Sequence, residues 1–465
     1  MAGRFHLVTL GCPKNVVDSD KIAAALGSDG CVATDDVGTA DLVVVNTCAL
    51  IEDARRESIE TVLALADARR PGARLLVTGC LAERYGEELA DALPEVDAVV
   101  GFDGAGAISA YATPDANAAT EVAFLGRRGA GPSPLGVRDL LELPRAAPSA
   151  PWAYLKVAEG CDRACAFCAI PSFRGKQRSR TPDSIVREAR DLVAGGAAEL
   201  VLVAQDLAWY GRDVGEPGAL APLLQRLDSE LASEGLARVR LLYLYPSEVK
   251  DPLVSTMLDL PTVVPYFDLS LQHAARGLLK RMARWGSGDR FLSAIDTIRA
   301  REPDAAFRSS FIVGFPGETE ADHETLLAFL DDAQLDWAGF FPFSEEEGTP
   351  ASKIMDGRVD ATLVAERLRE CEALQTEVTQ AARDALVLAE APLEVLVDAV
   401  AHGTVVGRTH REAPEIDGVV HVDCASWEQG GDATAVPGDV ILARVTGALG
   451  PDLYARAVHA LRGPQ

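Results

Sequence analysis

The sequence predicts an α/β protein with three parts: an N-terminal parallel α/β domain, a central partial barrel of six strand–helix units, and a C-terminal small antiparallel β-barrel. Residues 1–125 hold apolar runs that alternate with helical segments, and residues 152–389 hold six more such runs. Residues 390–465 hold five short strand-like runs. Alternating strands and helices predict parallel sheets, whereas short strands between turns predict a small barrel.

Three apolar runs of the N-terminal domain each end at a cysteine. They are Phe5–Cys12, Leu42–Cys48 and Leu75–Cys80, and helical segments at 16–26 and 53–69 separate them. Continuous runs of Val and Leu indicate strands that are buried on both faces of a parallel sheet. Ligands of such sheets lie beyond the carboxyl ends of the strands, so the three cysteines are expected at one edge, where they could converge.

The segment 126–151 is rich in Gly, Pro and Ala, which indicates a linker or a crossing segment. The strand-like runs that follow are 152–158, 199–204, 238–244, 264–271, 306–313 and 335–343. Six units predict a partial parallel α/β barrel, whose chemistry lies on loops at the carboxyl ends of its strands. The amphipathic run 361–389 predicts a helix that packs on the barrel and leads out of it.

The C-terminal part is expected to be all β. Its runs are 393–400, 404–407, 419–422, 440–445 and 453–457, separated by Gly, Pro and Asp turns. Five short strands in so few residues suit a small barrel of the oligonucleotide-binding kind.

Three cysteines lie on the loop after the first barrel strand. Cys161, Cys165 and Cys168 are spaced C-x3-C-x2-C. Thiolates are soft ligands, and so short a loop can bring three of them to the corners of one iron–sulfur cubane. A structural zinc site needs four protein ligands, and no fourth Cys or His lies nearby in the sequence. The spacing therefore favours a [4Fe-4S] cluster with one open iron over zinc or over three buried cysteines without a ligand.

The N-terminal cysteines indicate a second metal site. Any one of Cys12, Cys48 and Cys80 would, taken alone, be interpreted as a small buried hydrophobe. Three at the same position of successive strands favour a three-cysteine metal site. The remaining cysteines lack this placement and are interpreted as structural: Cys31, Cys371 and Cys424.

The loop spacing of the cysteines resembles that of the radical SAM superfamily. The resemblance implies that S-adenosylmethionine (SAM) chelates the open iron, and that one electron from the reduced cluster cleaves SAM to methionine and a 5′-deoxyadenosyl radical. It also implies that the loop with Gly314, Gly317 and Glu318 contacts SAM. Without the cluster, that loop would be interpreted as a strand-to-helix turn with a favourable acid in the first turn of the helix.

Further polar residues lie where barrel strands end. Gln205 and Asp206 follow the second strand, and Gln272 and His273 follow the fourth, where contacts to SAM or substrate are expected. A lone histidine there is as readily structural as functional.

Three arginines follow the cluster loop: Arg174, Arg178 and Arg180. They are expected to hold the SAM carboxylate or the substrate, or else to form a solvated face. The cofactor-binding residues that we predict are Gln205, Gly314, Gly317, Glu318 and Arg174. The sequence identifies no catalytic acid or base.

Composition limits the class of protein. The formal net charge is −26 over 465 residues, whereas a protein that binds nucleic acid through phosphates normally has a basic face. Solubility and attraction of a basic partner both explain such a charge. No apolar run approaches the roughly 20 residues of a membrane span, and Met1–Phe5 has no signal-peptide pattern. Nine cysteines without a disulfide framework indicate reduced thiols. We therefore expect a cytoplasmic protein that does not associate with membranes.

The three parts together resemble the methylthiotransferases, whose last module is a TRAM domain, and the resemblance covers essentially the whole chain. It implies two [4Fe-4S] clusters: Cys161, Cys165 and Cys168 hold the one that cleaves SAM, and Cys12, Cys48 and Cys80 hold an auxiliary one that carries the sulfur. One SAM methylates that sulfur, and a second yields the radical that removes a hydrogen from the substrate carbon, which then captures the methylthio group. The electron donor and the sulfur source are left unidentified.

Within this family, the resemblance implies two substrate classes: tRNA adenosine derivatives, and an aspartate of small ribosomal subunit protein twelve. The motifs similar to the ribosomal-protein branch are Gly11-Cys12-Pro13-Lys14-Asn15, Val17-Asp18-Ser19, Cys161-Asp162-Arg163, Cys168-Ala169-Ile170-Pro171-Ser172-Phe173-Arg174-Gly175, Gln177-Arg178-Ser179-Arg180 and Ala413-Pro414-Glu415-Ile416-Asp417-Gly418. They favour the aspartate, with a 3-methylthioaspartyl residue as the product.

Charge in residues 390–465 also favours a protein substrate. This part has no Lys and five Arg, and its acids include Glu412, Glu415, Asp417, Asp423, Asp432 and Asp439. A module that binds tRNA should carry several cations for phosphates, so the acidic face suits a basic protein better. Two alternatives stay open: a tRNA adenosine methylthiotransferase, and a non-catalytic iron–sulfur or RNA-binding factor in ribosome assembly.

Overall fold

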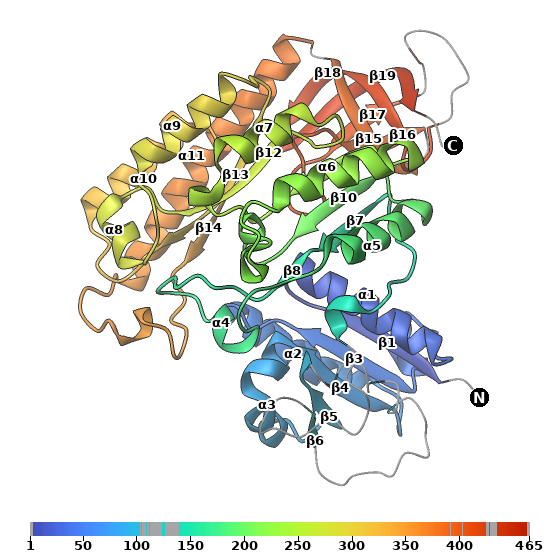
Figure 1. Cartoon of the computed structure of the whole chain (residues 1–465). Helices are drawn as coiled ribbons and strands as arrows, with labels where there is room; N and C mark the ends of the chain where they lie inside the picture. The colour runs from blue at the N-terminus through green and yellow to red at the C-terminus, as the bar shows by residue number, and fades with distance from the viewer. Residues whose placement is uncertain are drawn as a thin grey trace.

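The computed structural model describes residues 3–102, 104, 108, 111, 123–125, 139–390, 392–401, 403–424, 427 and 435–462. Figure 1 shows three parts: a sheet domain in blue, a curved arrangement of strands and helices from green to orange, and a small β-barrel in red. Of the segment 126–151, residues 126–138 lie outside the described residues, and the rest contains one short 3-10 turn at Leu140–Glu142 (η3).

The N-terminal domain is a parallel sheet, as its apolar runs predict. Its strands are β1 (Arg4–Thr9), β2 (Val32–Ala33), β3 (Leu42–Thr47), β4 (Arg74–Gly79), β5 (Ala98–Val100) and β6 (Ala123–Leu125), in the order β2-β1-β3-β4-β5-β6. Its helices are α1 (Pro13–Ser28), α2 (Glu52–Ala68) and α3 (Cys80–Ala92). All six residues of β3 are buried, which explains its continuous run of apolar residues. The register pairs Thr9 with Asn46 and Thr47 with Gly79, so the carboxyl ends of β1, β3 and β4 meet at one edge.

The central domain contains the six predicted strands. They are β7 (Trp152–Lys156), β10 (Glu199–Val203), β11 (Arg238–Leu241), β12 (Tyr266–Gln272), β13 (Ala306–Val313) and β14 (Trp337–Pro342). Its helices are α4 (Ile170–Phe173), α5 (Pro182–Ala194), α6 (Leu220–Leu231), α7 (Asp251–Asp259), α8 (Arg276–Arg281), α9 (Gly288–Arg299), α10 (Glu320–Ala333) and α11 (Ala361–Leu388). A two-stranded ribbon, β8 (Ala158–Glu159) with β9 (Arg178–Ser179), flanks the cysteine loop.

The six strands form a parallel arc with one weak seam. β7, β10 and β11 make one three-stranded sheet, and β12, β13 and β14 make another. Only isolated parallel bridges join β11 to β12, between Val239 and Val263 and between Leu244 and Leu269. Pro265, which has no N–H, directly precedes β12 and removes one donor from a continuous ladder. The sequence did not predict this seam.

The C-terminal part is a closed barrel. Its strands are β15 (Pro392–Ala401), β16 (Thr404–Arg408), β17 (Val420–Asp423), β18 (Val440–Leu449) and β19 (Asp452–Arg462), in the order β15-β16-β17-β19-β18. Every neighbouring pair is antiparallel, as predicted, except β17 with β19, which pair in parallel where the barrel closes. Alternate residues such as Val395, Val397 and Ile441 fill the core.

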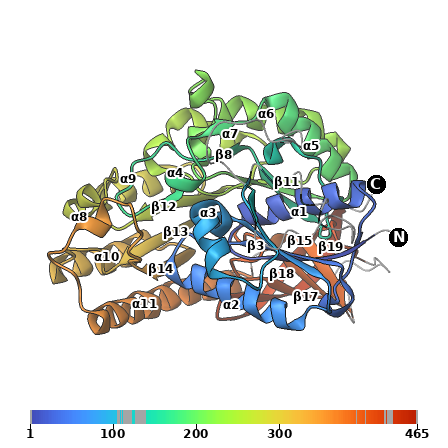
Figure 2. The ribbon, with the colours of Figure 1, turned by 90° about the horizontal axis from the view of Figure 1, so that it is seen from below.

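The N-terminal domain lies against the carboxyl ends of the barrel strands. Glu346, which follows β14, accepts ion pairs from Arg55 of α2 at 2.5 Å and from Arg84 of α3 at 2.6 Å. Seen from below, the blue domain lies in front of the barrel, and α11 runs along one side (Figure 2). The cysteine-bearing edge of the sheet therefore faces the end of the barrel at which barrel enzymes carry their chemistry. Within the described ranges, no helix is long and apolar enough to cross a membrane.

Candidate functional site

The cysteines that end β1, β3 and β4 come together at the sheet edge. Cys12 caps the N-terminus of α1, Cys48 directly follows β3, and Cys80 is the first residue of α3. A Cβ atom on Gly11, whose φ is +94°, would lie 2.7 Å from Cys48 Cβ and 2.9 Å from its Sγ. Only a glycine therefore lets the chain before Cys12 pass so close to Cys48.

Asn15 ties the same strand ends together. Its side-chain amide donates to the carbonyl of Leu10 at 2.8 Å and to the carbonyl of Thr47 at 3.0 Å. Asn15 is fully buried, and its backbone carbonyl accepts from Asn46 Nδ2 at 2.9 Å. These bonds fix the loops that precede Cys12 and Cys48. The sequence motif included Asn15 but gave it no role.

The three N-terminal thiols differ in their electrostatic surroundings. Burial raises the pKa of Cys80 to about 12, and the charges of Cys12 and Cys48 add to this rise. Burial also raises the pKa of Cys48. It opposes ionisation of Cys12 too, but the charges of Lys14 and Arg174, with backbone N–H donors at the start of α1, lower the pKa of Cys12 overall. Each thiol thus lies within electrostatic reach of the others, in a site that favours a thiolate at Cys12.

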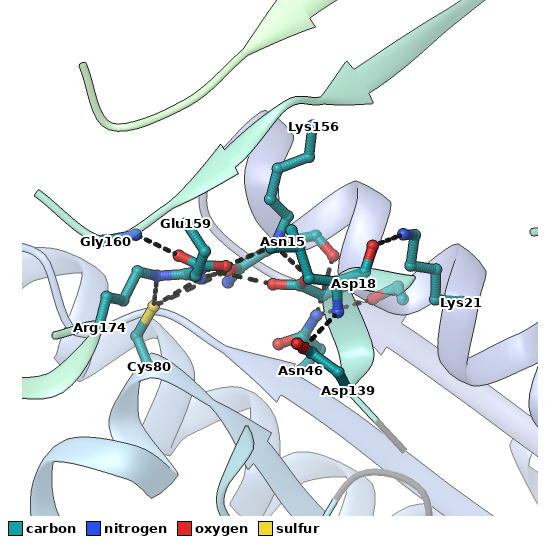
Figure 3. Close-up of polar contacts among 12 residues, drawn as sticks. Asn15, Asp18, Lys21, Asn46, Cys80, Asp139, Lys156, Glu159, Gly160 and Arg174 are labelled. Carbon is teal, nitrogen blue, oxygen red and sulfur yellow. Dashed lines mark hydrogen bonds and ion pairs between the residues drawn. The ribbon is translucent and has the colours of Figure 1, made fainter. Parts of the chain in front are cut away.

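Arg174 reaches this triad from the barrel domain. Its Nε and Nη2 atoms donate to Cys80 Sγ at 3.3 and 3.1 Å, and Nη2 also donates to Asn15 Oδ1 at 2.7 Å (Figure 3). Nη1 donates to Glu159 Oε1 at 2.8 Å. Burial opposes the charge on Arg174, but the nearby anions hold its pKa well above the usual value. We predicted Arg174 as a SAM contact, and the structure places it at the N-terminal cysteines.

A buried ion network surrounds Arg174. Asp18 of α1 pairs with Arg174 at 3.5 Å and with Lys156 of β7, and Lys156 pairs with Glu159 at 2.7 Å. Gln205 Nε2 also donates to Glu159 Oε1 at 2.7 Å. Figure 3 shows Asp18, Lys156, Glu159 and Arg174 of this network. Glu159 is two residues from Cys161, so the network connects the two cysteine triads across the domain boundary.

The second triad occupies the loop between β8 and α4. The N–H of Cys161 donates to the carbonyl of Gly175 at 3.1 Å, and Gly160 has φ +80°. A Cβ atom on Gly160 would lie 2.2 Å from the carbonyl oxygen of Lys176, so the loop closes only on a glycine. Burial raises the pKa of Cys161 to about 11 and that of Cys168 to about 12.

The loop cysteines also have cations beside them. Arg284, which follows α8, donates to Cys165 Sγ at 3.4 Å and stacks on Tyr245 with its guanidinium 4.0 Å from the ring centroid. Arg163 lies between Tyr245 and Trp209, at 3.8 and 4.0 Å from their centroids. Neither contact was predicted, since nothing in the spacing of these residues indicates the stack.

The donor set fits an iron–sulfur cluster. Each triad offers three thiols with cations nearby that would compensate anionic thiolates. Among the described residues, no group of three or more Cys, His, Asp or Glu side chains is placed to hold a metal ion. A [4Fe-4S] cubane takes each thiolate on a separate iron, so it does not require three side chains to surround one ion. At the rim of the barrel, Gln205 Oε1, Asp206 Oδ1 and His273 Nε2 are buried without a protein partner and offer polar contacts to a bound molecule.

The predicted glycine loop after β13 is bonded internally. Glu318 Oε2 accepts from the N–H of Gly314 at 2.5 Å, and Oε1 accepts from Arg367 Nη1 at 3.0 Å. Gly314 and Gly317 have φ of +83° and +81°, and a Cβ atom on Gly314 would lie 2.5 Å from Val364. Both Glu318 oxygens thus stabilise the turn and its contact with α11. The SAM contacts of these residues stay a prediction.

The other residues predicted at the rim of the barrel, Asp206, Gln272 and His273, differ in their contacts. Asp206 accepts from Arg163 Nε at 2.6 Å. Gln272 ends β12 with a positive φ of 75°. His273 is fully buried, burial lowers its pKa to about 3, and its Nδ1 accepts from the N–H of Ala275 at 3.0 Å. His273 is therefore a neutral residue that stabilises a turn.

The side chains of Arg178 and Arg180 pair with carboxylates outside both triads. Arg178 is exposed and pairs with Asp139 at 2.6 Å. Arg180 is buried, donates to the carbonyl of Lys156 at 2.9 Å, and pairs with Glu188 at 2.7 Å. Arg178 thus belongs to the solvated face that the sequence left open, whereas Arg180 joins β7 to α5.

Part of the predicted acidic face of residues 390–465 is internal. Glu412 is buried and pairs with Arg383 of α11 at 2.9 Å. Asp417 accepts from Tyr266 at 2.6 Å and pairs with Arg308 at 3.3 Å. Glu415 and Asp423 are exposed, and Asp432 lies outside the described residues. Interpreting Glu412 and Asp417 as surface charge was wrong, because both are neutralised at the contact with the barrel domain.

Comparison with known proteins assigns all three parts. Residues 4–101 match the uncharacterized protein family UPF0004, residues 155–330 match the radical SAM superfamily, and residues 391–458 match the TRAM domain. Among solved structures, the radical S-adenosylmethionine methyltransferase TsrM from Kitasatospora setae, with cobalamin and a [4Fe-4S] cluster bound, has a TM-score of 0.50 at 16% identity. The match covers 76% of this chain and 77% of that one, and it supports the fold.

Curated relatives cover nearly the whole chain. A ribosomal protein uS12 methylthiotransferase RimO from Saccharopolyspora erythraea is 42% identical over 98% of this chain and 96% of its own length. The RimO proteins of Salinispora tropica and Geobacter sulfurreducens are 42% and 41% identical, over 97% and 98% of this chain and 95% and 98% of their own lengths. With both cysteine triads in place and this identity from end to end, the chain belongs to the RimO family of ribosomal protein uS12 methylthiotransferases.

Proposed function

We propose that this protein is a radical SAM methylthiotransferase that replaces a hydrogen on the β-carbon of an aspartate in ribosomal protein uS12 with a methylthio group. The observation that carries the proposal is the contact network from Cys80 through Arg174 to Glu159, beside Cys161. It links the N-terminal triad to the segment that leads into the loop triad. The names of the relatives supply the substrate.

Each triad is proposed to hold one [4Fe-4S] cluster. When bound, the cluster on Cys161, Cys165 and Cys168 with SAM supplies a radical that removes a hydrogen atom, and the cluster on Cys12, Cys48 and Cys80 supplies the sulfur. We propose SAM contacts at Gln205, Gly314, Gly317 and Glu318, with the unpartnered Gln205 Oε1 as the most direct support.

The chain's own residues orient this chemistry. Asn15 fixes the loops of Cys12 and Cys48, Arg174 holds Cys80, and Arg284 contacts Cys165. The ion pairs of Glu346 with Arg55 and Arg84 hold the N-terminal domain against the end of the barrel.

The test is anaerobic turnover of cluster-reconstituted protein with SAM and a reductant, offering uS12 and unmodified tRNA in parallel, with mass spectrometry of both. A methylthio group on the uS12 aspartate supports the proposal. A methylthio group on tRNA alone keeps the reaction and overturns the substrate. Deoxyadenosine without either product points to another acceptor, and absence of SAM cleavage favours a non-catalytic assembly factor.

A Cys48→Ala variant separates the two triads. It should retain SAM cleavage and lose methylthio transfer, because only the N-terminal triad is disturbed. Unaltered transfer would contradict the assignment of the second cluster.

The proposal also includes domain bounds, a cellular location and partners. We propose a domain division at 1–125, 126–151, 152–389 and 390–465, a cytoplasmic location without membrane association, and partners that include an electron donor and a sulfur source of unknown identity. The alternative function, methylthiolation of tRNA adenosine, would require a basic surface, and its binding would fall steeply with salt.

A further inference from the structure

The segment 276–290, which runs from α8 into the first turn of α9, is basic in an acidic chain. The whole chain has 44 basic and 70 acidic residues, whereas the only acid of this segment is Asp289. An excess of acids keeps a protein soluble, but solubility does not explain a local excess of cations. The segment therefore indicates a surface that contacts an anionic partner. Its cations are Arg276, Lys280, Arg281, Arg284 and Arg290.

Most of these cations are exposed, and their charge is not balanced within the protein. In the ranges that the structure describes, no ion pair joins Arg276, Lys280 or Arg290 to a carboxylate. Arg281 is exposed too, and its pair with Asp322 is long, at 3.8 Å. The positive charge of the segment is thus available to a partner.

The exposed arginines of two other barrel helices differ in this respect. Arg190 of α5 pairs with Glu230 at 3.1 Å and with Glu234 at 3.2 Å. Arg226 of α6 pairs with Asp183 at 2.7 Å and with Glu230 at 2.6 Å. The surface charge of α5 and α6 is therefore balanced by neighbouring acids, which sets the segment 276–290 apart.

An exposed aromatic ring lies within the basic segment. The side chain of Trp285 is 41% exposed, and the guanidinium of Arg290 lies 5.5 Å from its ring centroid. Gly286 follows with φ +122°, and a Cβ atom there would lie 2.3 Å from the ring of Phe291. A hollow of about 380 Å³, which Trp285 and Arg290 help to line, lies beside the ring. Trp and Arg are the residues that contribute most often to the centre of protein interfaces.

The basic segment also contacts the loop of the second cysteine triad. The N–H of Ala166 donates to the carbonyl of Met282 at 2.9 Å, and Arg284 donates to Cys165 Sγ at 3.4 Å. Trp285 directly follows Arg284 in the sequence. A protein that docks on Trp285 would therefore lie one residue away from the contact with the loop triad.

We propose that the segment 276–290 is the docking surface of an acidic electron-carrier protein, with Lys280, Trp285 and Arg290 as its principal contacts. The inference rests on the proposed function. In that reaction the carrier is oxidised by one electron and the SAM sulfonium is reduced by one, as its bond to the 5′-carbon breaks to give methionine and the deoxyadenosyl radical.

The chemistry of the surface suits such a carrier. Electron-transfer complexes are weak and small, so complementary charge can supply much of their specificity and association rate. A basic protein substrate would be repelled by the same surface. RNA is the other anion that these cations could bind, but the contact with the loop of Cys165 favours a partner that delivers electrons.

The experiment measures binding of flavodoxin, an acidic flavin protein, to the reconstituted protein by calorimetry at low and at raised ionic strength. We compare the native chain with a double variant, Lys280→Glu with Arg290→Glu. The matched control is Arg187→Glu with Arg369→Glu, which reverses two exposed arginines of α5 and α11. The native chain and the control should bind flavodoxin less tightly as salt rises. The Lys280 and Arg290 variant should bind at least about tenfold more weakly at low salt.

A second readout separates docking from damage to the triad. With dithionite as reductant, the Lys280 and Arg290 variant should produce deoxyadenosine at the native rate, because a small reductant needs no docking surface. With reduced flavodoxin, the same variant should be slower by about the factor lost in binding. If the reversed charges prevent folding, Lys280→Gln with Arg290→Gln takes their place, because it removes the charges without adding repulsion.

Three results would overturn the proposal. They are unchanged flavodoxin affinity in the Lys280 and Arg290 variant, an equal loss in the control, and binding of a ribosomal RNA fragment through Lys280 and Arg290 without binding of flavodoxin. Failure of the proposed function is distinct, because calorimetry needs no turnover. A protein that binds flavodoxin through this segment and modifies neither uS12 nor tRNA would keep the docking surface and lose the assigned reaction.

Discussion

The two cysteine triads are built in opposite ways. The loop triad takes all three cysteines from one short segment, and local backbone devices position it: the left-handed Gly160 and the bond from Cys161 to Gly175. The N-terminal triad takes one cysteine from each of three strand ends, so the register of β1, β3 and β4 positions it. The cysteines of the first are brought together by one loop, which Ala166 bonds to Met282 and Ala351 of the same domain, whereas those of the second need a folded sheet.

The surroundings of the triads differ accordingly. Arg284, the cation beside Cys165, comes from within the barrel domain. Cys80 depends on Arg174, which reaches it across the domain boundary and is itself held by Glu159 and Asp18. The N-terminal site is therefore complete only when the two domains are docked. Substitutions at the loop triad should therefore affect one domain, whereas substitutions at the N-terminal triad should also affect the contact between the two domains.

The largest effect is expected from Cys165→Ala. It removes a ligand of the proposed SAM-cleaving cluster, so SAM cleavage and methylthio transfer should both fall to the level of the metal-free protein. Deoxyadenosine, measured by chromatography, checks this against Cys48→Ala, which should still produce it. Equal deoxyadenosine from both variants would show that the triads do not have separate functions.

Arg174→Gln tests the coupling between the domains. It leaves Glu159 and Asp18 buried with one cation fewer, so the free energy of unfolding should fall by about 3–5 kcal/mol. Arg178→Gln is the matched control, because Arg178 is an exposed arginine whose pair with Asp139 should contribute about 1 kcal/mol or less. Denaturant unfolding measures both. The Arg174 variant should also bind less iron while cleaving SAM, and equal stability losses in the two variants would contradict the network.

Gly160→Ala tests the close backbone packing that positions the loop triad. The new Cβ would meet the carbonyl of Lys176 in a left-handed backbone, so the loop must shift and the cluster spectrum should change. Gly175→Ala, at φ +74° with no atom near the new Cβ, carries only the conformational cost of roughly 1 kcal/mol. Thermal melts and cluster absorbance compare the two. If both behave alike, close packing at Gly160 is unimportant.

The smallest effect concerns the thiols of the cluster-free protein. The pKa of Cys12 is lowered and that of Cys80 is raised to about 12, so at pH 7–8 more of Cys12 is thiolate. Iodoacetamide should therefore modify Cys12 before Cys80, and Cys80 should react faster as the pH rises. Peptide mass spectrometry against time gives both rates. Faster reaction of Cys80 at neutral pH would show that its thiolate is stabilised more than its burial allows.

The sequence was informative where local pattern determines structure. Apolar runs predicted the strands, including all six of the barrel, because buried parallel strands are mostly apolar; Val and Leu dominate β3 and β10. The cysteines at the strand ends followed from the same pattern, since parallel strands end at one edge.

Local sequence patterns could not predict contacts between segments that lie far apart in the sequence. The SAM contact of Arg174 stays a prediction, whereas its bond to Cys80 was not predicted, because that bond depends on how two domains dock. Glu412 and Asp417 were interpreted as surface charge, yet Arg383 and Arg308 neutralise them. The number of acidic residues in a segment does not show which of them form buried ion pairs. Lys14 was noted within a motif, but its contact with the ring of Tyr243 becomes visible only in the structure.

Removing the C-terminal barrel would leave buried charges of the central domain without their ion-pair partners. Glu199 of β10 is fully buried between Arg240 of β11 at 2.7 Å and Arg408 of β16 at 2.6 Å, and Arg408 is held in turn by Asp398. A chain cut before β15 would leave Glu199 with half its counter-charge and Arg383 without Glu412. The barrel is therefore part of the charge balance of the central domain, and a chain without it should be less stable.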